Sequence, residues 1–444
     1  MAAWSQALWS PGLLILFLLV GGYFSFRTGF FQLFGLRVWM RGTIGSLFQK
    51  HRSVGGLSQF QVISTALGAT VGTGSIAGVA TAICLGGPGA VFWMWVSALL
   101  GMMTGYAEKV LAIAYRHKRG TDWEGGPAEY ITEGLHMPLL AGFFSIACVL
   151  ASFSGGNVVQ ANSIASIMQT AFGFNPLLSG VLLALLTGMV ILGGIARIGR
   201  VCAALVPAMA ALFVGGGLFV LAVHHAAIPD AFSAIINGAF TPHAALSGGV
   251  GFSMATAMRY GIARGVFTNE AGMGSSAMAH ATADVESAEE QGFWGILQVF
   301  LATIVIATLS ALVILTSGIP QNATLSGVPL AARAFETVLG SWSGIFLAVC
   351  LLLFAFSSLL GWNYYGERSI SYLTHNPRAK QIYRLVFIAL IVLGSLADVG
   401  AVWDLADFCN GLMALANLPA LLLLSPKVLS IWRAERAKSR NPQK

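Results

Sequence analysis

Long apolar stretches alternate with short charged ones along almost the whole chain. A membrane-spanning helix needs about 20 mostly apolar residues, and eleven segments of this kind are separated by charges or turn-forming residues. They lie near residues 10–26, 58–84, 89–114, 139–169, 176–194, 201–223, 247–280, 292–317, 341–364, 383–399 and 402–425. The pattern predicts an all-α polytopic membrane protein with about 11 transmembrane helices.

The composition indicates the same class. Of the 444 residues, 56% are hydrophobic and only 9% are charged, and the mean hydropathy is +0.77. The core of a soluble globular protein is too small to hide that much apolar surface. We therefore attribute the net charge of +7 to membrane topology rather than to nucleic-acid binding. The sequence indicates no obligate protein partner.

Basic residues predict the orientation in the membrane. Segments 27–57, 115–138, 195–200, 365–384 and the C-terminal tail together carry twenty lysines and arginines, whereas the opposite loops carry only Arg333. By the positive-inside rule, the basic segments face the cytoplasm. We expect a multi-pass protein of the cell membrane, with the N-terminus outside and the C-terminus in the cytoplasm.

Two of the spans are interrupted by glycines. The stretch "GATVGTGSIAGVA", residues 68–80, carries four glycines, which alone would suit close helix packing as well as a break. The stretch "RYGIARGVFTNEAGMGSSAMAHA", residues 259–281, combines four glycines with Arg264, Asn269 and Glu270. Irregular backbone at membrane depth is tolerated only beside protein or a watery cavity. Two such breaks therefore predict a binding site between them.

The breaks also reveal a repeat. They lie about 195 residues apart, each in the first helix of a five-helix block, 58–223 and 247–425. An odd number of helices inverts the second block, so the sequence predicts a 5+5 inverted repeat with two broken helices plus one extra N-terminal helix. Residues 1–57 then form that helix and a cytoplasmic connector, 58–425 the core, and 426–444 a basic cytoplasmic tail. The connector is either an amphipathic helix on the membrane surface or a packed link.

Several stretches resemble the alanine or glycine:cation symporter family. They are "VGTGSIAGVATAICLGGPGAVFWMWVSALLG", "GGNVVQANSIA", "GGIARIGRV", "YGIARGVFTNEAGMGS" and "GWNYYGER", and the resemblance covers residues 57–425. It implies the leucine-transporter fold with one extra N-terminal helix. It also implies symport of small neutral amino acids with sodium, or in some members with protons. The substrate class and the coupling ion come from the resemblance alone.

The two breaks offer groups for both ends of an amino acid. In the first break, backbone N–H groups and nearby hydroxyls suit a carboxylate. In the second, carbonyls suit an ammonium group and a phenylalanine offers an aromatic wall. The residues expected at the first break are Gly72, Thr73, Gly74 and Ser75, and those expected at the second are Phe267, Thr268 and Asn269.

Three further residues are assigned to the substrate pocket, each with a structural alternative. Asn157 and Gln160 share one helical face, where they either contact the substrate or hydrogen-bond to neighbouring helices. The resemblance favours substrate contact for Gln160. Trp362 either closes the side-chain pocket or lies at the membrane interface.

Adjacent hydroxyls at Ser357 and Ser358 are expected to bind the coupling ion. The resemblance implies a sodium ion held by two hydroxyls and by carbonyls of the first broken helix, here those of Ala69 and Gly72. The alternative is a serine pair that packs two helices together. We expect no other cofactor. The sequence shows no nucleophile and base, phosphate loop or catalytic carboxylate pair, so we expect no enzyme activity.

Ionisable residues at membrane depth are costly and are functional by default. We expect Arg264 to pair with Glu270 in a gate, and proton coupling through Glu270 or Glu108 is the competing interpretation. Three aspartates flank the turn between the last two spans and are expected near the outer surface: Asp398, Asp404 and Asp407.

Three positions depart from the pattern of the family that the chain resembles. Ser75 stands where Asn is common, which calls a side-chain amide contact to the substrate into question. Glu129 adds a cytoplasmic charge, and Ala302 replaces a frequent Asp. The expected function is import of alanine and glycine by sodium symport with alternating access. Glutamine or a D-amino acid as substrate, proton coupling, and a sensor that binds without transport are the alternatives.

Overall fold

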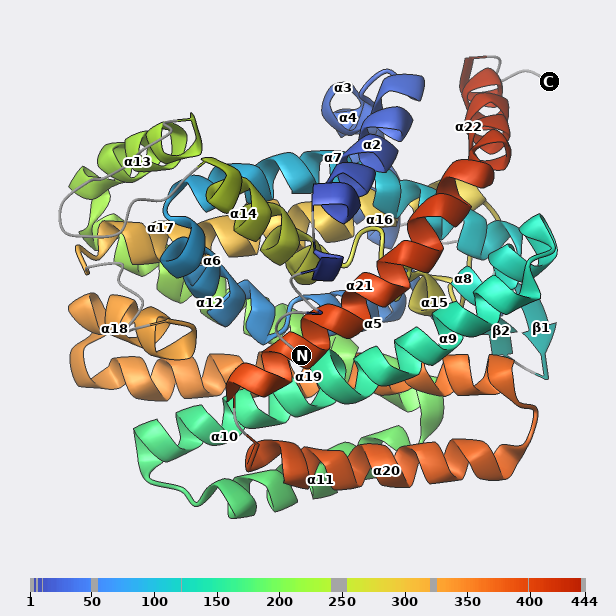
Figure 1. The fold of residues 1–444 in the computed structure, drawn as a ribbon. Helices are drawn as coiled ribbons and strands as arrows, with labels where there is room; N and C mark the ends of the chain where they lie inside the picture. Colours follow the sequence, from blue (N-terminus) through green and yellow to red (C-terminus); the bar gives the residue numbers. More distant parts are fainter. Residues whose placement is uncertain are drawn as a thin grey trace.

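The computed structural model is almost entirely helical, and its long helices lie side by side in one bundle (Figure 1). It describes residues 4, 7–9, 11–48, 55–120, 122–240, 254–319, 326–397 and 399–440. Outside these ranges lie the start of the span expected from residue 247, Asp398, and three of the twenty basic residues counted above, Lys50, Arg52 and Lys444.

The first half of the chain contains one extra N-terminal helix, a connector and the helices of the first predicted repeat. The helix and connector are α2 (Pro11–Arg27), α3 (Phe31–Phe34), α4 (Leu36–Gly42) and η1 (Ile44–Phe48). The elements that follow are α5 (Gln59–Thr70), η2 (Thr73–Ser75), α6 (Ala77–Gly86), α7 (Gly89–Ala114), β1 (His117–Arg119), β2 (Asp122–Glu124), α8 (Pro127–Glu129), η3 (Tyr130–Gly134), α9 (Pro138–Phe153), η4 (Ser154–Val158), α10 (Val159–Phe172), α11 (Pro176–Ile191) and α12 (Gly194–Val223). Strands β1 and β2 pair as an antiparallel hairpin.

The second half repeats the pattern and ends in an additional helix. Its elements are η5 (His225–Ala227), α13 (Ile228–Phe240), α14 (Met254–Asn269), α15 (Ala277–His280), α16 (Ala288–Val299), η6 (Phe300–Ala307), α17 (Thr308–Thr316), α18 (Val328–Leu339), η7 (Gly340–Trp342), α19 (Ser343–Leu373), α20 (Pro377–Ser395), α21 (Val399–Leu423) and α22 (Ser425–Arg440).

The first predicted break is present. Helix α5 begins with a capping box, in which the side chain of Ser58 accepts a hydrogen bond from the backbone of Gln61 and the side chain of Gln61 reaches back to the backbone of Ser58. The helix ends at Thr70, and Gly72 adopts an extended backbone, with φ −97° and ψ −156°. A single 3₁₀ turn then precedes α6. The unwound segment therefore leaves backbone N–H and C=O groups outside any helix.

The second predicted break is also present. Helix α14 ends at Asn269, and the next residues include three with left-handed backbone, Glu270 (φ 57°), Gly272 (φ 86°) and Gly274 (φ 78°). Glycine adopts this conformation at no steric cost, whereas a glutamate does so rarely. The two glycines thus explain why the chain stays unwound until α15.

The two broken helices lie antiparallel. Helix α5 contacts α15 and α6 contacts α14, so the first half of each lies against the second half of the other. At one end, the backbone N–H of Leu57 donates to the carbonyl of Thr282 at 2.9 Å, and the N–H of Asp284 donates to the carbonyl of Leu57 at 2.8 Å. An inverted repeat requires this arrangement, and the predicted fold is confirmed.

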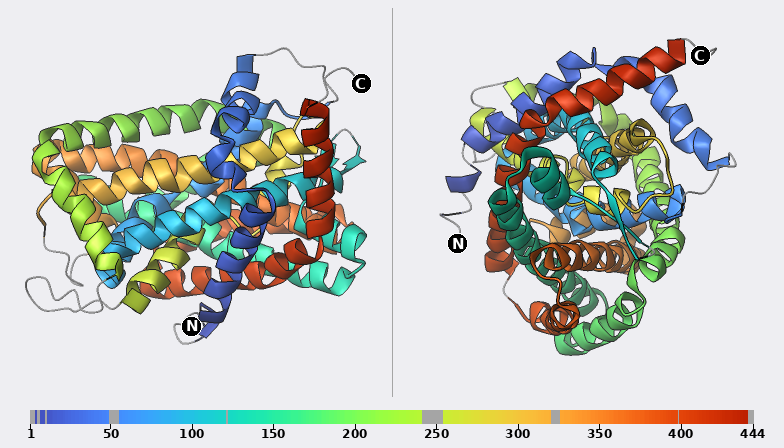
Figure 2. Two further views of the ribbon diagram at one scale, coloured as in Figure 1. Left: turned by 90° about the horizontal axis from the view of Figure 1, so that it is seen from above. Right: turned by 90° about the vertical axis from the view of Figure 1, so that its right-hand side faces the viewer.

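Six helical segments are long and apolar enough to cross a membrane by length and composition, among the described residues: Gly89–Ala114, Pro138–Phe172, Gly194–Val223, Ala288–Thr316, Val328–Leu373 and Val402–Leu423. They confirm a multi-pass membrane protein. The extra helix α2 lies across the long helices rather than along them (Figure 2). The count of eleven crossings and the orientation of the termini remain predictions.

The connector after α2 consists of short helices with two different faces. Phe31 and Trp39 are buried, and the ring of Phe31 packs against Phe293 of α16 and Trp432 of α22. Leu33 and Phe34 are exposed. The segment is therefore packed on one side, as expected for a packed link. Its other side is apolar and exposed, as expected for an amphipathic helix on the membrane surface.

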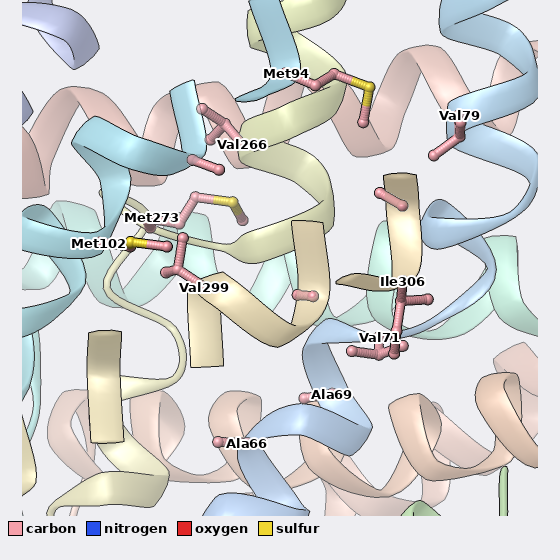
Figure 3. Packing of buried hydrophobic residues seen from close by; sticks show 14 of the residues in the cluster. Ala66, Ala69, Val71, Val79, Met94, Met102, Val266, Met273, Val299 and Ile306 are labelled. Carbon is pink, nitrogen blue, oxygen red and sulfur yellow. The ribbon is translucent and has the colours of Figure 1, made fainter. Parts of the chain in front are cut away.

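Small apolar side chains surround the breaks. Figure 3 shows Ala66 and Ala69 of α5 in the same packed cluster as Val266 of α14 and Met273 of the second break. A Cβ atom added to Gly361 of α19 would lie 2.6 Å from the Cβ of Ala69. This close approach brings α19 against the end of α5, where the first break begins.

Candidate functional site

A small buried cavity lies between the two breaks. The first broken helix contributes Ala69, Thr70, Gly72 and Gly74 to its lining. The other elements contribute Gly155, Gln160, Phe267, Glu270, Trp362 and Asn410. Residues from five separate parts of the chain thus meet at one point, and five of the ten residues assigned to the substrate from sequence line the cavity: Gly72, Gly74, Gln160, Phe267 and Trp362.

One end of the cavity is polar. The side-chain oxygen of Gln160 accepts hydrogen bonds from the backbone N–H of Thr73 at 3.3 Å and from the Thr73 hydroxyl at 3.2 Å. The Gln160 amide nitrogen donates to the carbonyl of Gly155 at 3.0 Å. The Gln160 oxygen therefore accepts hydrogen bonds from the unwound segment at the place where the sequence predicted that a carboxylate would bind.

Gly72 allows this close approach. A Cβ atom at position 72 would lie 2.5 Å from the Ser358 hydroxyl and 3.1 Å from the side-chain oxygen of Gln160. Both distances are shorter than ordinary van der Waals contact. Only glycine fits between α19 and α10 here, which is the physical reason for a glycine at the centre of the motif.

The other end of the cavity is aromatic. A Cβ atom at Gly74 would lie 2.8 Å from the ring of Phe267, and one at Gly156 would lie 2.4 Å from the Cβ of Trp362. The rings of Phe267 and Trp403 are 5.3 Å apart. Glycines on two helices thus let the aromatic side chains close around a narrow space.

Four of the assigned residues use their side chains elsewhere. The Asn157 amide donates to the carbonyl of Phe387 at 2.7 Å, which is the structural alternative given for it. The Thr268 hydroxyl donates to its own helix at Arg264, and the Asn269 amide donates to the Thr303 hydroxyl at 3.1 Å. The Ser75 hydroxyl is buried outside the cavity lining. The side chains of Asn157, Thr268 and Asn269 therefore bond to groups outside the cavity, whereas the Ser75 hydroxyl has no hydrogen-bond partner among the described residues.

Ser357 and Ser358 converge on the last turn of α5. The Ser358 hydroxyl lies 2.8 Å from the carbonyl oxygen of Gly68 and 3.2 Å from that of Ala69. The Ser357 hydroxyl lies 3.2 Å from the same Gly68 oxygen. Two hydroxyls and two carbonyls thus form a compact group of hard oxygen atoms, the ligand type that alkali and alkaline-earth cations prefer. The Gly68 carbonyl was not among the predicted ligands. The predicted Gly72 carbonyl instead accepts a hydrogen bond from the backbone N–H of Ser75 at 3.1 Å.

The predicted ion pair between Arg264 and Glu270 is wrong. Arg264 donates two hydrogen bonds to Asp407 of α21, at 3.0 and 2.5 Å. The two side chains are only 11% and 17% exposed, so the pair is largely buried; the position of Asp407 near the outer surface remains a prediction. The guanidinium also lies over the rings of Phe267 and Trp403. The pair therefore lies beside the ring of Phe267, which lines the cavity.

Breaking this pair is expected to destabilise the protein. Arg264→Gln leaves the Asp407 carboxylate buried without its partner, which should lower the free energy of unfolding by about 3 kcal/mol. The double variant with Asp407→Asn should lose less than the sum of the two single variants. Chemical denaturation of the detergent-solubilised protein measures both. Arg333→Gln is the control, because its pair with Glu336 is exposed; additive losses would contradict the pairing.

Glu270 and Glu108 instead hold the second break. The hydroxyl of Ser275 donates to the Glu270 carboxylate at 2.5 Å. One oxygen of Glu108, on α7, accepts from the backbone N–H groups of Gly272 and Gly274, both at 2.9 Å. The buried Lys109 donates to the other oxygen of Glu108 at 3.0 Å. Both glutamates therefore satisfy backbone or neighbouring groups that unwinding exposes.

The residue Arg116, just past the C-terminal end of α7, binds the chain beyond the second break. The guanidinium of Arg116, two residues past the end of α7, donates to the carbonyls of Ala281, Ala283 and Val285 at 3.2, 2.6 and 2.5 Å. Glu108 thus attaches the unwound segment to α7, and Arg116 attaches the chain after α15 to the end of the same helix.

A buried polar chain that the sequence analysis missed leads from the cavity. Gln291 hydrogen-bonds to one ring nitrogen of His280 at 2.5 Å, and the other nitrogen contacts Gln298 at 3.1 Å. Gln298 then donates to the Thr70 hydroxyl at 2.7 Å. The sequence signal was available, because a histidine and two glutamines within apolar spans need buried partners. Asn410, which lines the cavity, was also missed for want of any motif around it.

Comparison with known proteins identifies a family with similar sequences. All 444 residues match the model of the sodium:alanine symporter family. The chain is 40% identical to the sodium/alanine symporter AgcS of Methanococcus maripaludis, over 98% of this chain and 96% of that protein. It is 38% identical to the probable sodium/glutamine symporter GlnT of Bacillus subtilis, over 96% of this chain and 88% of that protein.

Solved structures share the fold at much lower identity. The structure of MhsT in complex with L-phenylalanine matches with a TM-score of 0.63 and 16% identity, covering 84% of this chain and 90% of that one. A Na⁺-coupled sialic acid symporter matches with a TM-score of 0.53 and 14% identity, covering 88% and 82%. These similarities confirm the leucine-transporter-like fold and show the fold alone.

Proposed function

This chain belongs to the sodium:alanine symporter family, and we propose that it imports small neutral amino acids, alanine and glycine among them, by symport with sodium through alternating access. The observation that carries the proposal is the cavity enclosed between two antiparallel broken helices. Paired breaks of this kind are the substrate sites of inverted-repeat transporters. The chain is a transporter rather than an enzyme, in the cell membrane with its C-terminus in the cytoplasm.

The polar end of the cavity suits the two charged groups of an amino acid. The side-chain oxygen of Gln160 accepts hydrogen bonds from the backbone N–H and the hydroxyl of Thr73. A substrate carboxylate would accept those same two hydrogen bonds in its place. The carboxylate of Glu270 lines the cavity and suits the substrate ammonium group. The substrate side chain then points to the aromatic end, beside Phe267 and Trp362.

Sodium is proposed to bind between α5 and α19. Its ligands are the hydroxyls of Ser357 and Ser358 with the carbonyls of Gly68 and Ala69, whose oxygens already lie together. The site is next to Gly72, whose position contacts both Ser358 and Gln160. Ion and substrate therefore share the end of α5, so that binding of one favours the backbone geometry that the other needs.

The pair of Arg264 and Asp407 is proposed as the gate at the aromatic end. It joins α14 to α21 directly above Phe267. Opening the cavity at this end requires the pair to separate, and closing it excludes water from the substrate.

Uptake into proteoliposomes tests the function. Radiolabelled alanine should accumulate when an inward sodium gradient is imposed at fixed pH, and unlabelled glycine should block it. Collapse of the sodium gradient is the control. Accumulation driven by a pH gradient alone would replace sodium with protons, and block by glutamine but not by glycine would point to the substrate named for the Bacillus subtilis relative. Binding without accumulation would indicate a sensor.

A further inference from the structure

The aromatic end of the cavity contains one polar side chain that nothing else in the site explains. Asn410, on α21, is only 2% exposed and lines the cavity. Its side-chain oxygen has no hydrogen-bond partner among the described residues. A buried acceptor without a donor is unfavourable, because it has lost water and gained nothing. A bound substrate that carries a hydrogen-bond donor would satisfy it.

Asn410 lies beside Phe267, in the part of the cavity that we propose for the substrate side chain. A Cβ atom added to Gly155 would be 3.8 Å from the Asn410 amide nitrogen and 3.9 Å from the ring of Phe267, so these groups meet at one place. The Thr73 backbone, proposed for the carboxylate, belongs to the polar end with Gln160. Asp407, one helical turn before Asn410, is already occupied by Arg264.

On this basis, and resting on the proposed function, we propose that Asn410 selects small amino acids whose side chain carries a hydroxyl, and that serine is preferred over alanine. The serine hydroxyl donates its hydrogen to the Asn410 oxygen, whereas the alanine methyl leaves that oxygen unpaired. An added Cβ at Gly155 would also lie 3.3 Å from the Cβ of Ala406, so η4 and α21 pack closely at this place. A site built around a substrate hydrogen bond discriminates strongly against the analogue that lacks it.

Sodium-driven uptake by the wild-type protein and by Asn410→Leu tests the proposal, because leucine keeps the size of asparagine without its polar atoms. In the wild type, the KM for serine should be about tenfold lower than that for alanine. In Asn410→Leu, the serine KM should rise about tenfold while alanine uptake persists, so that the preference is lost.

Asn363→Leu is the matched control. Asn363 is also buried on a core helix with neither amide atom partnered among the described residues, but it is not part of the cavity lining. Its replacement should leave the ratio of the two KM values unchanged. An unchanged ratio in Asn410→Leu, with alanine still accumulated, overturns the selectivity role and leaves the proposed function intact. Failure of the wild type to accumulate any amino acid with sodium overturns the function itself.

Competition on the wild-type protein gives a second test that needs no variant. Serine and 2-aminobutyrate have the same size, but the latter carries a methyl group in place of the hydroxyl. Serine should block alanine uptake at about one tenth of the concentration that 2-aminobutyrate requires. Equal potency of the two compounds overturns the proposal even if Asn410→Leu does not fold.

Discussion

Gly72→Ala is expected to reduce uptake about 100-fold. This loss corresponds to a free-energy cost of roughly 3 kcal/mol, the upper end of the range for adding a methyl group to a closely packed contact. The new methyl group would lie 2.5 Å from the Ser358 hydroxyl and 3.1 Å from the Gln160 oxygen, so it displaces a group of the ion site and a group of the substrate site together. Initial uptake rates in proteoliposomes, measured over a range of substrate concentrations, give the effect on both KM and maximal rate.

Gly78→Ala is the control for this variant. Gly78 belongs to the same broken helix and is also buried, but an added Cβ would meet only the Arg264 side chain, at 3.9 Å. Uptake by Gly78→Ala should stay close to that of the wild type. Equal loss in both variants would mean that glycine flexibility, rather than close approach, matters in this segment.

The double variant Ser357→Ala with Ser358→Ala is expected to raise the sodium concentration for half-maximal uptake at least about tenfold, since each lost oxygen ligand removes roughly 1 kcal/mol or more. The alanine KM at saturating sodium should change much less. The sodium dependence of uptake, at constant ionic strength, measures the shift.

Ser371→Ala is the corresponding control on the same helix. Its hydroxyl is also buried and donates to the carbonyl of Glu367 at 2.8 Å, within α19 itself. Sodium dependence should be unaffected there. An unchanged sodium dependence in the double variant would return Ser357 and Ser358 to the packing role that is the alternative for them.

The positions of the breaks could be predicted because glycine acts locally. Gly272 and Gly274 adopt backbone angles that other residues avoid, and Gly72 leaves space that no side chain can share. Such constraints are visible in a sequence without knowledge of the fold. Gln160, Phe267 and Trp362, which also line the cavity, were assigned on other grounds, namely a shared helical face with the family resemblance, a place at the second break, and aromatic character.

Pairings between distant segments were harder to predict. Glu270 is six residues from Arg264 and was the obvious partner, yet Asp407 lies 143 residues away and has the correct geometry. Asn157 was expected to share an α-helical face with Gln160, but it lies in the π-helical turn η4 and donates to the backbone of α20 instead. Periodicity shows which residues lie on one helix face, and it does not show what that face meets.

The attachment of α7 to the second break has a mechanical consequence. Glu108 holds the unwound segment near its start and Arg116 holds the chain beyond its end, so this segment and α7 form one stiff lever. The unwound turn of the first break is held by neutral side chains instead of charged ones. Gln160 accepts from the Thr73 hydroxyl, and the Ser310 hydroxyl donates to the Ser75 carbonyl. We therefore expect the two halves of the inverted repeat to bend unequally, with the first break serving as the compliant joint of the transport cycle.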